Sequence, residues 1–521
     1  MNPMLQISIT GEEKPTPWLA MLLLLAAFQI GIVAPAAGQA GFDDDRGMLQ
    51  GFYWESCRHG DPDLPQFGTN KWYDIVRASA AQIRSARFDL IWLPPPSYAG
   101  FRSAGYGPKE YFNLNNSYGS FQQHCAMLEE LLRNGVEPVA DIVINHRDGL
   151  TNWAGFTKPA WGTWAISRND ECFSNPDSEV HNTPVNQRGA EEEKPTEYVQ
   201  HSGTTYQYES FRDLDHTEPR VRRDIIKYLL QLKSLGYRGW RYDMVHGFHA
   251  KWIALYNRAT QPTFSVGEYD WDKHANQRGW IWFTATDPAK TGEARLREAS
   301  SVFDFSSYFT LKDNKGRYAA WYGYGNGVGM VGDTSDGLPW KNRAVTFLEN
   351  HDTGYRTEPN GNPEKDHKFD SFSNSWEVEQ AYAYILTHPG VPCVYWKHYF
   401  DWSSDLRNKI NALINARKVA GVKSGTKLNT QQNALARGVY AAMLEGANGQ
   451  LYIRVGGSDA DWQPHFSDYH DYREYANGAG WKVWIKLPNN PAVRQAAGKP
   501  PLPQPQYRQP EDIVVPNNLL N

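Results

Sequence analysis

The chain has 521 residues, a formal net charge of −5, and 21% charged residues. This length exceeds one average domain and is enough for a large core. The weakly acidic balance argues against a nucleic-acid partner, because such proteins carry a basic face. Aromatic residues make up 14% of the chain, which fits either a large core or a surface that stacks on sugar rings.

Near the N-terminus, residues 17–33 form an apolar run that the small residues of APAAGQA follow. An apolar run before an Ala-x-Ala pattern is typical of a secretory signal peptide, and this one is short for a membrane span of ~20 residues. We therefore expect residues 1–40 to be removed on export, leaving a secreted, extracellular protein without stable membrane association. The acidic Glu12 and Glu13 do not fit the positive start of a signal, so a retained anchor is the alternative.

Four cysteines lie far apart in the sequence, at Cys57, Cys125, Cys172 and Cys393. None has the close C-x-x-C spacing that is typical of a zinc site. Export would permit disulfides, but the spacing leaves their pairing open.

Eight strand-like segments alternate with helical patterns. The segments are 47–54, 88–96, 137–146, 239–245, 263–269, 301–306, 344–352 and 390–396. Several are near-continuous apolar runs, as in parallel strands that are covered on both faces. Helices are predicted to begin after Ser120, with a capping box to Gln123, and at Pro219. The pattern predicts an α/β protein built on a (β/α)8 TIM barrel, whose active site lies at the C-terminal ends of the strands.

The predicted barrel consists of residues 41–146 and 213–420. Three other segments do not fit the barrel pattern. Residues 147–212, between the third and fourth strands, are too many for a structureless loop, so we expect an inserted domain. Residues 421–487 alternate apolar and polar positions between turns, which predicts an antiparallel β domain. Residues 488–521 contain PPLPQPQYRQP and are predicted to form a Pro-rich disordered tail.

The stretch RGWRYDMVHGF, residues 238–248, places two charged residues in an apolar strand. Arg241 and Asp243 are two positions apart, so strand alternation puts both on one face. Polar residues also end three other strands, in DIVINH (141–146), GEYD (267–270) and ENHD (349–352). A single Asp at a strand end often only caps the next helix, but four polar strand ends in one barrel predict a catalytic site.

These four motifs resemble, in order, the signature regions of the α-amylase family of retaining glycoside hydrolases, glycoside hydrolase family 13. Three more segments of this chain resemble other segments of the family. They are SAGYGPKEYFNLNNSYG (103–119), FRDLDH (211–216) and QAYAYILTHPGVPCVYW (380–396). The resemblance spans roughly residues 45–487 and looks closest to plant-type and maltotetraose-forming α-amylases. It implies a barrel with a domain B inserted after strand three and an antiparallel domain C.

The resemblance implies that Asp243 is the nucleophile, Glu268 the general acid/base and Asp352 the third carboxylate. A retaining glycosidase needs an ionised nucleophile and a protonated acid ~5–5.5 Å apart. Arg241 would supply positive charge that favours the ionised nucleophile. The implied substrate-binding residues are Arg241, His146, His351 and Tyr106. From the residues alone, His146 could equally be a core or capping histidine and Tyr106 a loop-packing residue.

Calcium is the implied cofactor, and it takes six to eight oxygen ligands. The resemblance implies Asn145, Asp213 and the carbonyl of Gly247 as ligands, and Asp170 and Asp177 are further candidates within the insertion. Asn145 could instead cap a turn.

We therefore expect a secreted, monomeric α-amylase that cleaves internal α-1,4-glucosidic bonds of starch, glycogen and maltooligosaccharides by double displacement. An exo-acting maltooligosaccharide-forming amylase or an α-glucan transglycosylase would use the same carboxylates. A non-catalytic carbohydrate-binding protein is the third alternative, and the complete set of carboxylates argues against it.

Overall fold

The computed structural model describes residues 42–149, 155–167, 170, 211–269, 274–323, 325–358, 360, 372, 374–464, 472–486 and 501–520. All of them belong to one compact unit, Gln39–Asn521. The expected signal peptide at 1–40, most of the expected insertion, and Cys172 and Asp177 lie outside the described residues.

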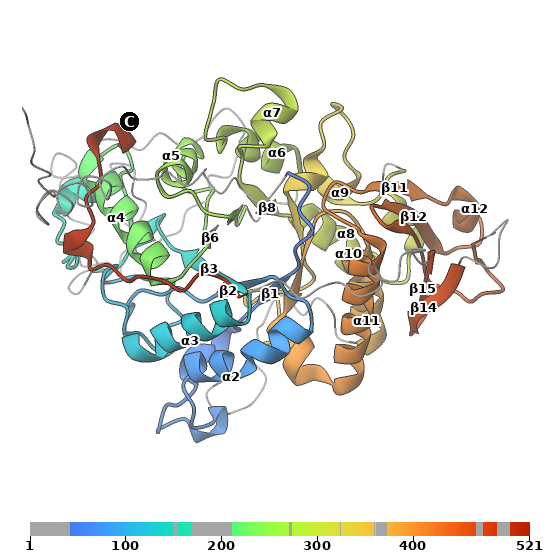
Figure 1. The fold of residues 1–521 in the computed structure, drawn as a ribbon, viewed down its shortest axis with the longest axis horizontal. Helices are drawn as coiled ribbons and strands as arrows, with labels where there is room; N and C mark the ends of the chain where they lie inside the picture. Colours follow the sequence, from blue (N-terminus) through green and yellow to red (C-terminus); the bar gives the residue numbers. More distant parts are fainter. Residues whose placement is uncertain are drawn as a thin grey trace, which may run out of the picture. The chain divides into compact units, whose positions relative to one another are not determined.

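Eight parallel strands close into a barrel in the order β1-β10-β9-β8-β7-β6-β3-β2 (Figure 1). They are β1 (Met48–Gln50), β2 (Leu90–Leu93), β3 (Glu137–Ile142), β6 (Gly239–Tyr242), β7 (Phe264–Gly267), β8 (Ser301–Phe303), β9 (Ala344–Thr346) and β10 (Val391–Tyr395). All eight predicted strands are confirmed, although each is shorter than its predicted segment. Asp243, Glu268 and Asp352 come after the last residues of β6, β7 and β9.

The described helices are α2 (Trp72–Ser85), α3 (Phe121–Arg133), α4 (Pro219–Leu235), α5 (Lys251–Thr260), α6 (His274–Phe283), α7 (Gly292–Leu296), α8 (Phe305–Asp313), α9 (Gly329–Gly332), α10 (Ser375–Thr387), α11 (Ser404–Ala420) and α12 (Gln432–Leu435). Both predicted helix starts are confirmed. The hydroxyl of Ser120 accepts from the N–H of Gln123 at 3.3 Å, and the Gln123 side chain accepts from the N–H of Ser120 at 2.9 Å. This capping box satisfies two N–H groups that the first helical turn leaves unpaired.

Side chains of β6 alternate as predicted. Trp240 donates from Nε1 to the hydroxyl of Thr260 on α5 at 3.0 Å, so it faces the surrounding helices. Arg241, one residue on, instead bonds Asp141 of the neighbouring strand β3. The strand therefore packs on one face and carries charge on the other.

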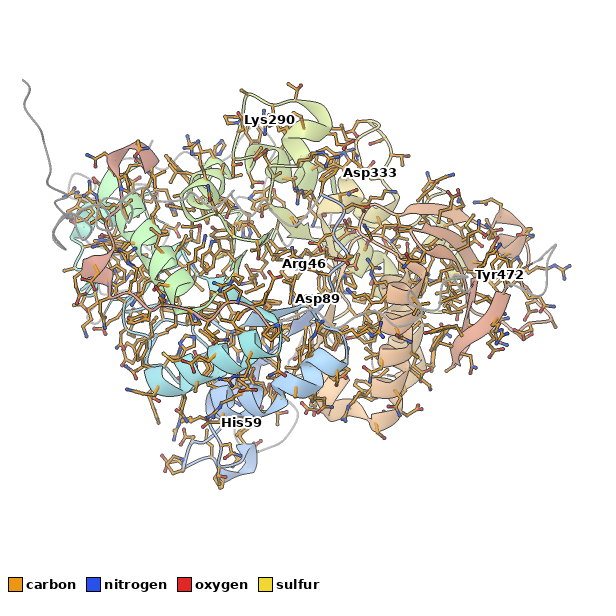
Figure 2. The ribbon with its side chains drawn as sticks, in the orientation of Figure 1. Arg46, His59, Asp89, Lys290, Asp333 and Tyr472 are labelled. Carbon is orange, nitrogen blue, oxygen red and sulfur yellow. The ribbon has the colours of Figure 1, made fainter. Side chains whose placement is uncertain are left out.

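The N-terminal ends of the strands carry buried ion pairs. Arg46, just before β1, bonds Asp44 at 2.7 Å and Glu137, the first residue of β3, at 3.1 Å. Asp89, just before β2, bonds Lys418 of α11 at 2.6 Å. Figure 2 labels Arg46 and Asp89, which lie near each other in the middle of the molecule. These contacts tie the strand starts together and leave the chemistry to the opposite end of the barrel.

The chain leaves the barrel after β3 and returns before α4 through two neighbouring strands. β4 (His146–Arg147) pairs antiparallel with β5 (Arg212–Asp213), with His146 opposite Asp213. An insertion between two elements of a barrel must leave and re-enter the barrel at neighbouring points. The pairing of β4 with β5 holds these two points side by side. The interior of the insertion remains a prediction.

Beyond α11 the chain forms an antiparallel sheet, as predicted. Its strands are β11 (Lys427–Thr430), β12 (Tyr440–Gly446), β13 (Gly449–Val455), β14 (Tyr472–Gly478) and β15 (Trp481–Lys486), in the order β11-β12-β13-β15-β14. Trp481 donates to Glu379 of α10 at 3.2 Å, and Gln380 donates to the carbonyl of Ala479 at 2.9 Å. The sheet thus packs beside α10 and α11 (Figure 1).

The C-terminal segment differs from the prediction of a disordered tail. Residues 501–520 run along the outside of α3 and α4 (Figure 1) and contain two 3-10 turns, Pro510–Asp512 and Asn517–Leu519. The N–H of Leu502 donates to the carbonyl of Leu132 at the end of α3, at 2.9 Å.

Apolar and polar anchors explain this order. Ile513 and Leu520 are buried, and the carbonyl of Leu520 accepts from Nε of Arg222 at 3.0 Å. Gln231 of α4 donates to the hydroxyl of Tyr507 at 2.9 Å. Proline lacks an N–H, so a proline-rich segment needs few backbone partners and a handful of anchors can hold it. Composition alone does not reveal those anchors.

In the part of the chain that the structure describes, no helix is long and apolar enough to cross a membrane. The cysteines Cys57, Cys125 and Cys393 of that part are free thiols. No disulfide joins these three cysteines in the described part of the chain.

Ile513→Ala is expected to lower the melting temperature, because burying this side chain contributes about 2 kcal/mol. Thermal unfolding followed by intrinsic fluorescence measures the shift. Val514→Ala is the matched control, since Val514 is 80% exposed and Ile513 only 3%. Equal melting temperatures for both variants would show that the C-terminal segment does not stabilise the barrel.

Candidate active site

A single buried arginine holds the side chains at the ends of β3, β6 and β7. Nη1 of Arg241 lies 2.7 Å from Oδ1 of Asp141 and 2.6 Å from Oδ1 of Asp243. Its Nη2 lies 2.9 Å from Oε2 of Glu268. One guanidinium therefore brings together the two carboxylates that were predicted to be nucleophile and acid/base.

Asp243 and Glu268 each come directly after the last residue of a strand. The N–H of Asp243 donates to the carbonyl of Ile142 at 3.0 Å, and the N–H of Glu268 donates to the carbonyl of Tyr242 at 2.9 Å. Met244 then takes a left-handed φ of 46°, which is uncommon for a residue other than glycine. In this conformation the N–H of Met244 donates to Oε2 of Glu268 at 3.1 Å. The strained residue thus helps to fix the Glu268 carboxylate.

The carboxylates around Arg241 outnumber its positive charge. Burial raises the pKa of Asp243 well above its ordinary value; Arg241 opposes this rise, while the charges of Glu268 and Asp141 add to it. Burial also raises the pKa of Asp141. Asp141 and Asp243 therefore hold their protons to a higher pH than isolated carboxyl groups do. As expected, Arg241 acts to lower the pKa of Asp243. The net pKa is nevertheless raised, because the charge of Arg241 is divided among three carboxylates.

His351 and Asp352 lie in a turn beyond β9, which ends at Thr346. The side chain of Asn350 accepts from the N–H of Asp352 at 2.8 Å and shapes the turn. Because the strand pleat is lost here, the two side chains meet, and Nε2 of His351 lies 3.0 Å from Oδ2 of Asp352. Gln50 lies 3.0 Å from the other ring nitrogen of His351.

The second oxygen of Asp352 is bound by an arginine of the same turn. Nη2 of Arg356 lies 2.9 Å from Oδ1 of Asp352, and its guanidinium lies 3.9 Å from the ring centre of Trp54. Burial alone would raise the pKa of Asp352, but His351, Arg356 and Arg241 hold it below its ordinary value. The side chain of Asp352 is 39% exposed, so an ionised carboxylate is open to a ligand.

Flat rings line the site beside these charges. The hydroxyl of Tyr106 donates to Oδ2 of Asp141 at 2.8 Å. The ring of Tyr106 lies within 6° of parallel to that of His351, with centroids 5.0 Å apart, and within 2° of parallel to Trp54 at 6.0 Å. Tyr106 is partly exposed. A ring fixed in this way is suited to stack on the apolar face of a sugar.

His146 contacts the backbone of the loop that carries Tyr106. Its Nε2 lies 2.7 Å from the carbonyl oxygen of Tyr106, and its Nδ1 lies 3.2 Å from Nδ2 of Asn145. Burial lowers the pKa of His146 to about 4, so the ring is neutral at ordinary pH. Both ring nitrogens have protein partners, and a contact with substrate stays a prediction.

The three residues predicted to bind Ca²⁺ converge next to the carboxylates. Nδ2 of Asn145 lies 3.2 Å from Oδ1 of Asp213. A Cβ added to Gly247 would lie 1.9 Å from Oδ1 of Asn145. That buried oxygen has no hydrogen-bond partner in the structure. The unpaired amide oxygen faces the bare backbone of Gly247, and the amide nitrogen of the same side chain contacts the carboxylate of Asp213. Such a set of oxygens fits a hard cation.

The remaining calcium candidates are less well placed. Oδ2 of Asp170 lies 2.6 Å from Nη1 of Arg212, an ion pair that already satisfies this oxygen. Asp177 lies outside the described residues. Among the described residues, no group of three or more His, Cys, Asp or Glu could hold a metal, so a site here depends on amide and backbone oxygens.

Two charged residues of the site are absent from the predicted set. Asp141 bonds Arg241 and Tyr106, and it accepts from Nε1 of Trp92 at 3.1 Å. Its charge within an apolar strand, in register with Arg241, is the signal that could have identified it. Arg356 lies four residues beyond Asp352, and no pattern in the sequence points to it.

Known proteins are similar to this chain in sequence and in fold. The model of the α-amylase catalytic domain matches residues 82–398. Probable α-amylase 2 of Arabidopsis thaliana is 28% identical over 457 residues, which cover 84% of this chain and 94% of the relative. A glucan 1,4-α-maltotetraohydrolase of Stutzerimonas stutzeri is 30% identical over 428 residues, which cover 79% of this chain and 68% of the relative.

A solved structure supports the fold alone. The α-amylase of Geobacillus thermoleovorans, crystallised with acarbose, superposes with a TM-score of 0.59 at 12% identity. The match covers 86% of this chain and 99% of that one.

Paired carboxyl groups at the C-terminal end of a parallel barrel place the protein among the glycoside hydrolases. The matched domain takes more than half of the chain and includes Asp243, Glu268 and Asp352. The chain belongs to the α-amylase family.

Asp141→Asn is expected to move the acid limb of the pH profile of kcat/KM to lower pH by about one unit. The substitution removes a negative charge that raises the pKa of Asp243, so the nucleophile would lose its proton at lower pH. Initial rates on soluble starch across pH measure the shift. Asp224→Asn is the control, because Asp224 bonds Trp161 at 2.7 Å, outside the cluster. An unchanged acid limb in Asp141→Asn would contradict the shared-charge account.

Proposed function

We propose that the protein is a secreted, monomeric α-amylase that hydrolyses internal α-1,4-glucosidic bonds of starch and glycogen with retention of configuration. The observation that carries this proposal is the contact of one arginine, Arg241, with both Asp243 and Glu268, at 2.6 and 2.9 Å. Two carboxyl groups on one guanidinium are close enough to act on the same glycosidic bond. Export is proposed from the apolar N-terminal run alone.

The reaction proceeds in two displacements. Glu268 first donates its proton to the glycosidic oxygen while Asp243 attacks the anomeric carbon, so the glycosidic bond breaks and a glycosyl ester forms on Asp243. The Glu268 carboxylate then takes a proton from water, whose oxygen attacks the same carbon and releases Asp243. The proton that Glu268 gives up in the first step returns to it from water in the second.

The other predicted residues would bind and stabilise the sugar. Asp352, held ionised by His351 and Arg356, would bind sugar hydroxyls and stabilise the positive charge that develops on the ring. Tyr106 would stack on the sugar at the cleavage site, while His146 and His351 would bind its hydroxyls.

Glu268→Gln is expected to reduce the release of reducing sugar from soluble starch by about 10²–10⁴-fold, because the amide cannot donate the proton. Glu293→Gln on α7, whose side chain is 48% exposed, is the matched control and should keep full activity. Equal rates for Glu268→Gln and the wild type, at equal melting temperature, would reject the assignment.

A second candidate function uses the same catalytic residues but gives different products. The similarity to a maltotetraohydrolase favours exo-acting release of short maltooligosaccharides, and a transglycosylase would use a sugar in place of water as acceptor. A time course of products from long maltooligosaccharides separates the three. Internal hydrolysis gives a mixture from the start, exo-action gives one product length, and transfer gives products longer than the substrate.

Calcium is the cofactor that the oxygen cluster would hold. Asn145, Asp213 and the carbonyl of Gly247 would bind Ca²⁺, and residues 147–212 would provide the remaining ligands. Bound there, the ion would balance the charge of Asp213 and join the ends of the insertion to the turn after β6.

Removal of calcium by a chelator is expected to lower the melting temperature of the wild type by about 5 °C, because a ligand that binds only the folded state stabilises it. Gly247→Ala should lose most of this shift, since its Cβ would displace Oδ1 of Asn145. Gly47→Ala is the control, because an added Cβ there meets no atom within 4 Å. A chelator shift that Gly247→Ala retains in full would reject the site.

A further inference from the structure

A pocket of about 370 Å³ opens beside the segments that supply Trp54 and Tyr106. Its lining comes from the turn after β1, around Cys57, and from residues 98–117 of the loop after β2. We call it the Phe101 pocket, after a ring that is 76% exposed on its rim. The volume is in the range of small-molecule sites, and none of the residues assigned to catalysis or calcium lines it.

The loop around Phe101 is held firmly although the ring itself is exposed. Arg102 has a left-handed φ of 59°, and its Nη2 bonds Asp61 at 3.0 Å and Asp63 at 2.8 Å. The thiol of Cys57 donates to the carbonyl of Arg102 at 3.4 Å. Strained backbone that surrounding contacts enforce is typical of functional loops.

One face of the Phe101 ring is already paired. The guanidinium of Arg102 lies 4.7 Å from the ring centre, and its two carboxylate partners hold it in that position. A single large apolar side chain exposed on a fixed loop is unlike the buried aromatics of the core. The rest of the ring surface is available to a ligand with an apolar face.

The charges of the pocket balance, which indicates a neutral ligand. Asp61, Arg102 and Lys71 line the pocket, and Asp63 beside it pairs with Arg102, so two anions oppose two cations. Lys71 also donates to the carbonyl of Ser117 at 3.4 Å. A phosphate or carboxylate ligand would find the Arg102 guanidinium already committed to its own carboxylates.

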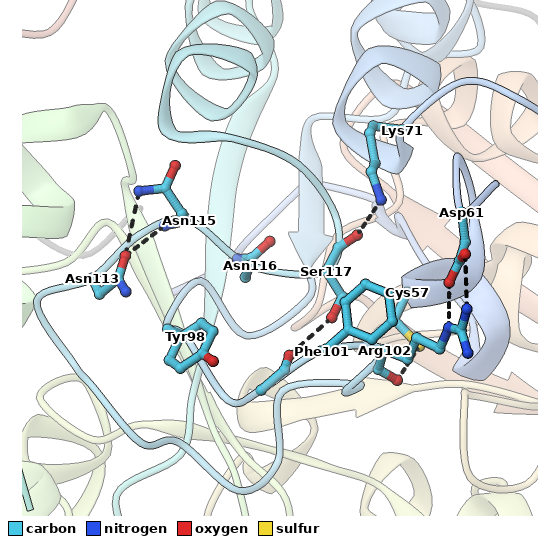
Figure 3. Close-up of a pocket in the computed structure, with 11 residues that line it drawn as sticks. Cys57, Asp61, Lys71, Tyr98, Phe101, Arg102, Asn113, Asn115, Asn116 and Ser117 are labelled. Atoms are coloured by element: carbon cyan, nitrogen blue, oxygen red, sulfur yellow. Dashed lines mark hydrogen bonds and ion pairs between the residues drawn. The ribbon is translucent and has the colours of Figure 1, made fainter. Parts of the chain in front are cut away.

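The rim opposite these charges is rich in amides. Figure 3 shows Asn113 and Asn115 on one side of the pocket and the Asp61–Arg102 pair on the other, with Phe101 between them. Nδ2 of Asn115 donates to Oδ1 of Asn113 at 3.3 Å, and Nδ2 of Asn113 donates to Glu110 at 2.8 Å. Each amide group has a second N–H, which can reach a ligand. Amides, a tyrosine hydroxyl at Tyr98 and a flat ring suit a ligand with many hydroxyl groups and an apolar face, which is the chemistry of a pyranose.

We propose that the Phe101 pocket is a second binding site for an α-glucan chain, separate from the catalytic cleft. The inference rests on the proposed function for the choice of sugar. Phe101 stacks on a glucose ring, and the amides of Asn113 and Asn115 bind hydroxyls. Because the same loop carries Tyr106, a long chain held here is kept close to the cleavage site, whereas a short one gains nothing.

Phe101→Ala is expected to lower kcat/KM on amylose about fivefold through KM, the loss that one stacking contact gives. Its kcat/KM on 2-chloro-4-nitrophenyl maltotrioside should stay within twofold of the wild type, since a substrate of this size does not reach both sites. Phe101→Trp should retain the activity on amylose. Trp376→Ala on α10, which removes another partly exposed aromatic ring (39% exposed), is the matched control and should leave both substrates unchanged.

An equal loss on both substrates would assign Phe101 a structural role and overturn the proposal. An unchanged rate on amylose, or the same loss in Trp376→Ala, would overturn it as well. Retention of the amylose rate by Phe101→Trp supports stacking over loop packing.

Titration calorimetry of Glu268→Gln with maltoheptaose tests the second binding site separately from the proposed catalytic function, because binding is measured without turnover. Two classes of site are expected, and Phe101→Ala in the same background should remove one. If the wild type does not hydrolyse glucans but the second class is present, the proposed function fails and the pocket stands. A single class in both proteins overturns the pocket.

Discussion

The site depends on one buried positive charge, the guanidinium of Arg241. An unpaired charge at this depth would cost several kcal/mol, so the arginine must be surrounded by carboxylates. It is bonded by Asp141, Asp243 and Glu268, which come from three successive strands of the barrel. The requirement to satisfy one cation therefore brings the reactive groups together. Burial, together with the excess of negative charge, raises the pKa of Asp243.

The two ends of the barrel solve the same electrostatic problem with different results. At the N-terminal end, Arg46 holds the pKa of Asp44 below its ordinary value against the effect of burial. At the C-terminal end, burial and neighbouring carboxylates raise the pKa of Asp243 despite Arg241. The first arrangement settles into a fixed ion pair, which contributes to stability. The second keeps Asp243 protonated over a wider range of pH than an isolated carboxyl group.

Periodicity and turn chemistry were enough to predict the barrel. Eight apolar runs became the eight strands, the capping box at Ser120 started α3, and Arg241 lay on the face opposite Trp240. The lengths of the strands were overestimated, because a polar residue such as Asp352 continues the sequence pattern after the backbone has turned. Asp141 was open to prediction by the same reasoning as Arg241, since both are charges in apolar strands.

Other features had no local signal. Arg356 reaches Asp352 from a turn whose geometry depends on Asn350. The order of residues 501–520 depends on contacts with α3 and α4, which lie far away in the sequence. Phe101 is unremarkable in composition and becomes notable only through its exposure. Contacts of this kind arise from tertiary structure, so a single sequence does not encode them in any short pattern.

The docking of the C-terminal segment has a consequence for the order of folding. Arg222 and Leu520 are 298 residues apart in the chain, so this contact closes a very long loop. At ribosomal rates, about 15–60 s pass between the synthesis of the two residues. During that interval the outer surfaces of α3 and α4 lack their partner. These helix surfaces are therefore covered only after Leu520 has been synthesised, so the contact that completes their packing forms long after the helices themselves.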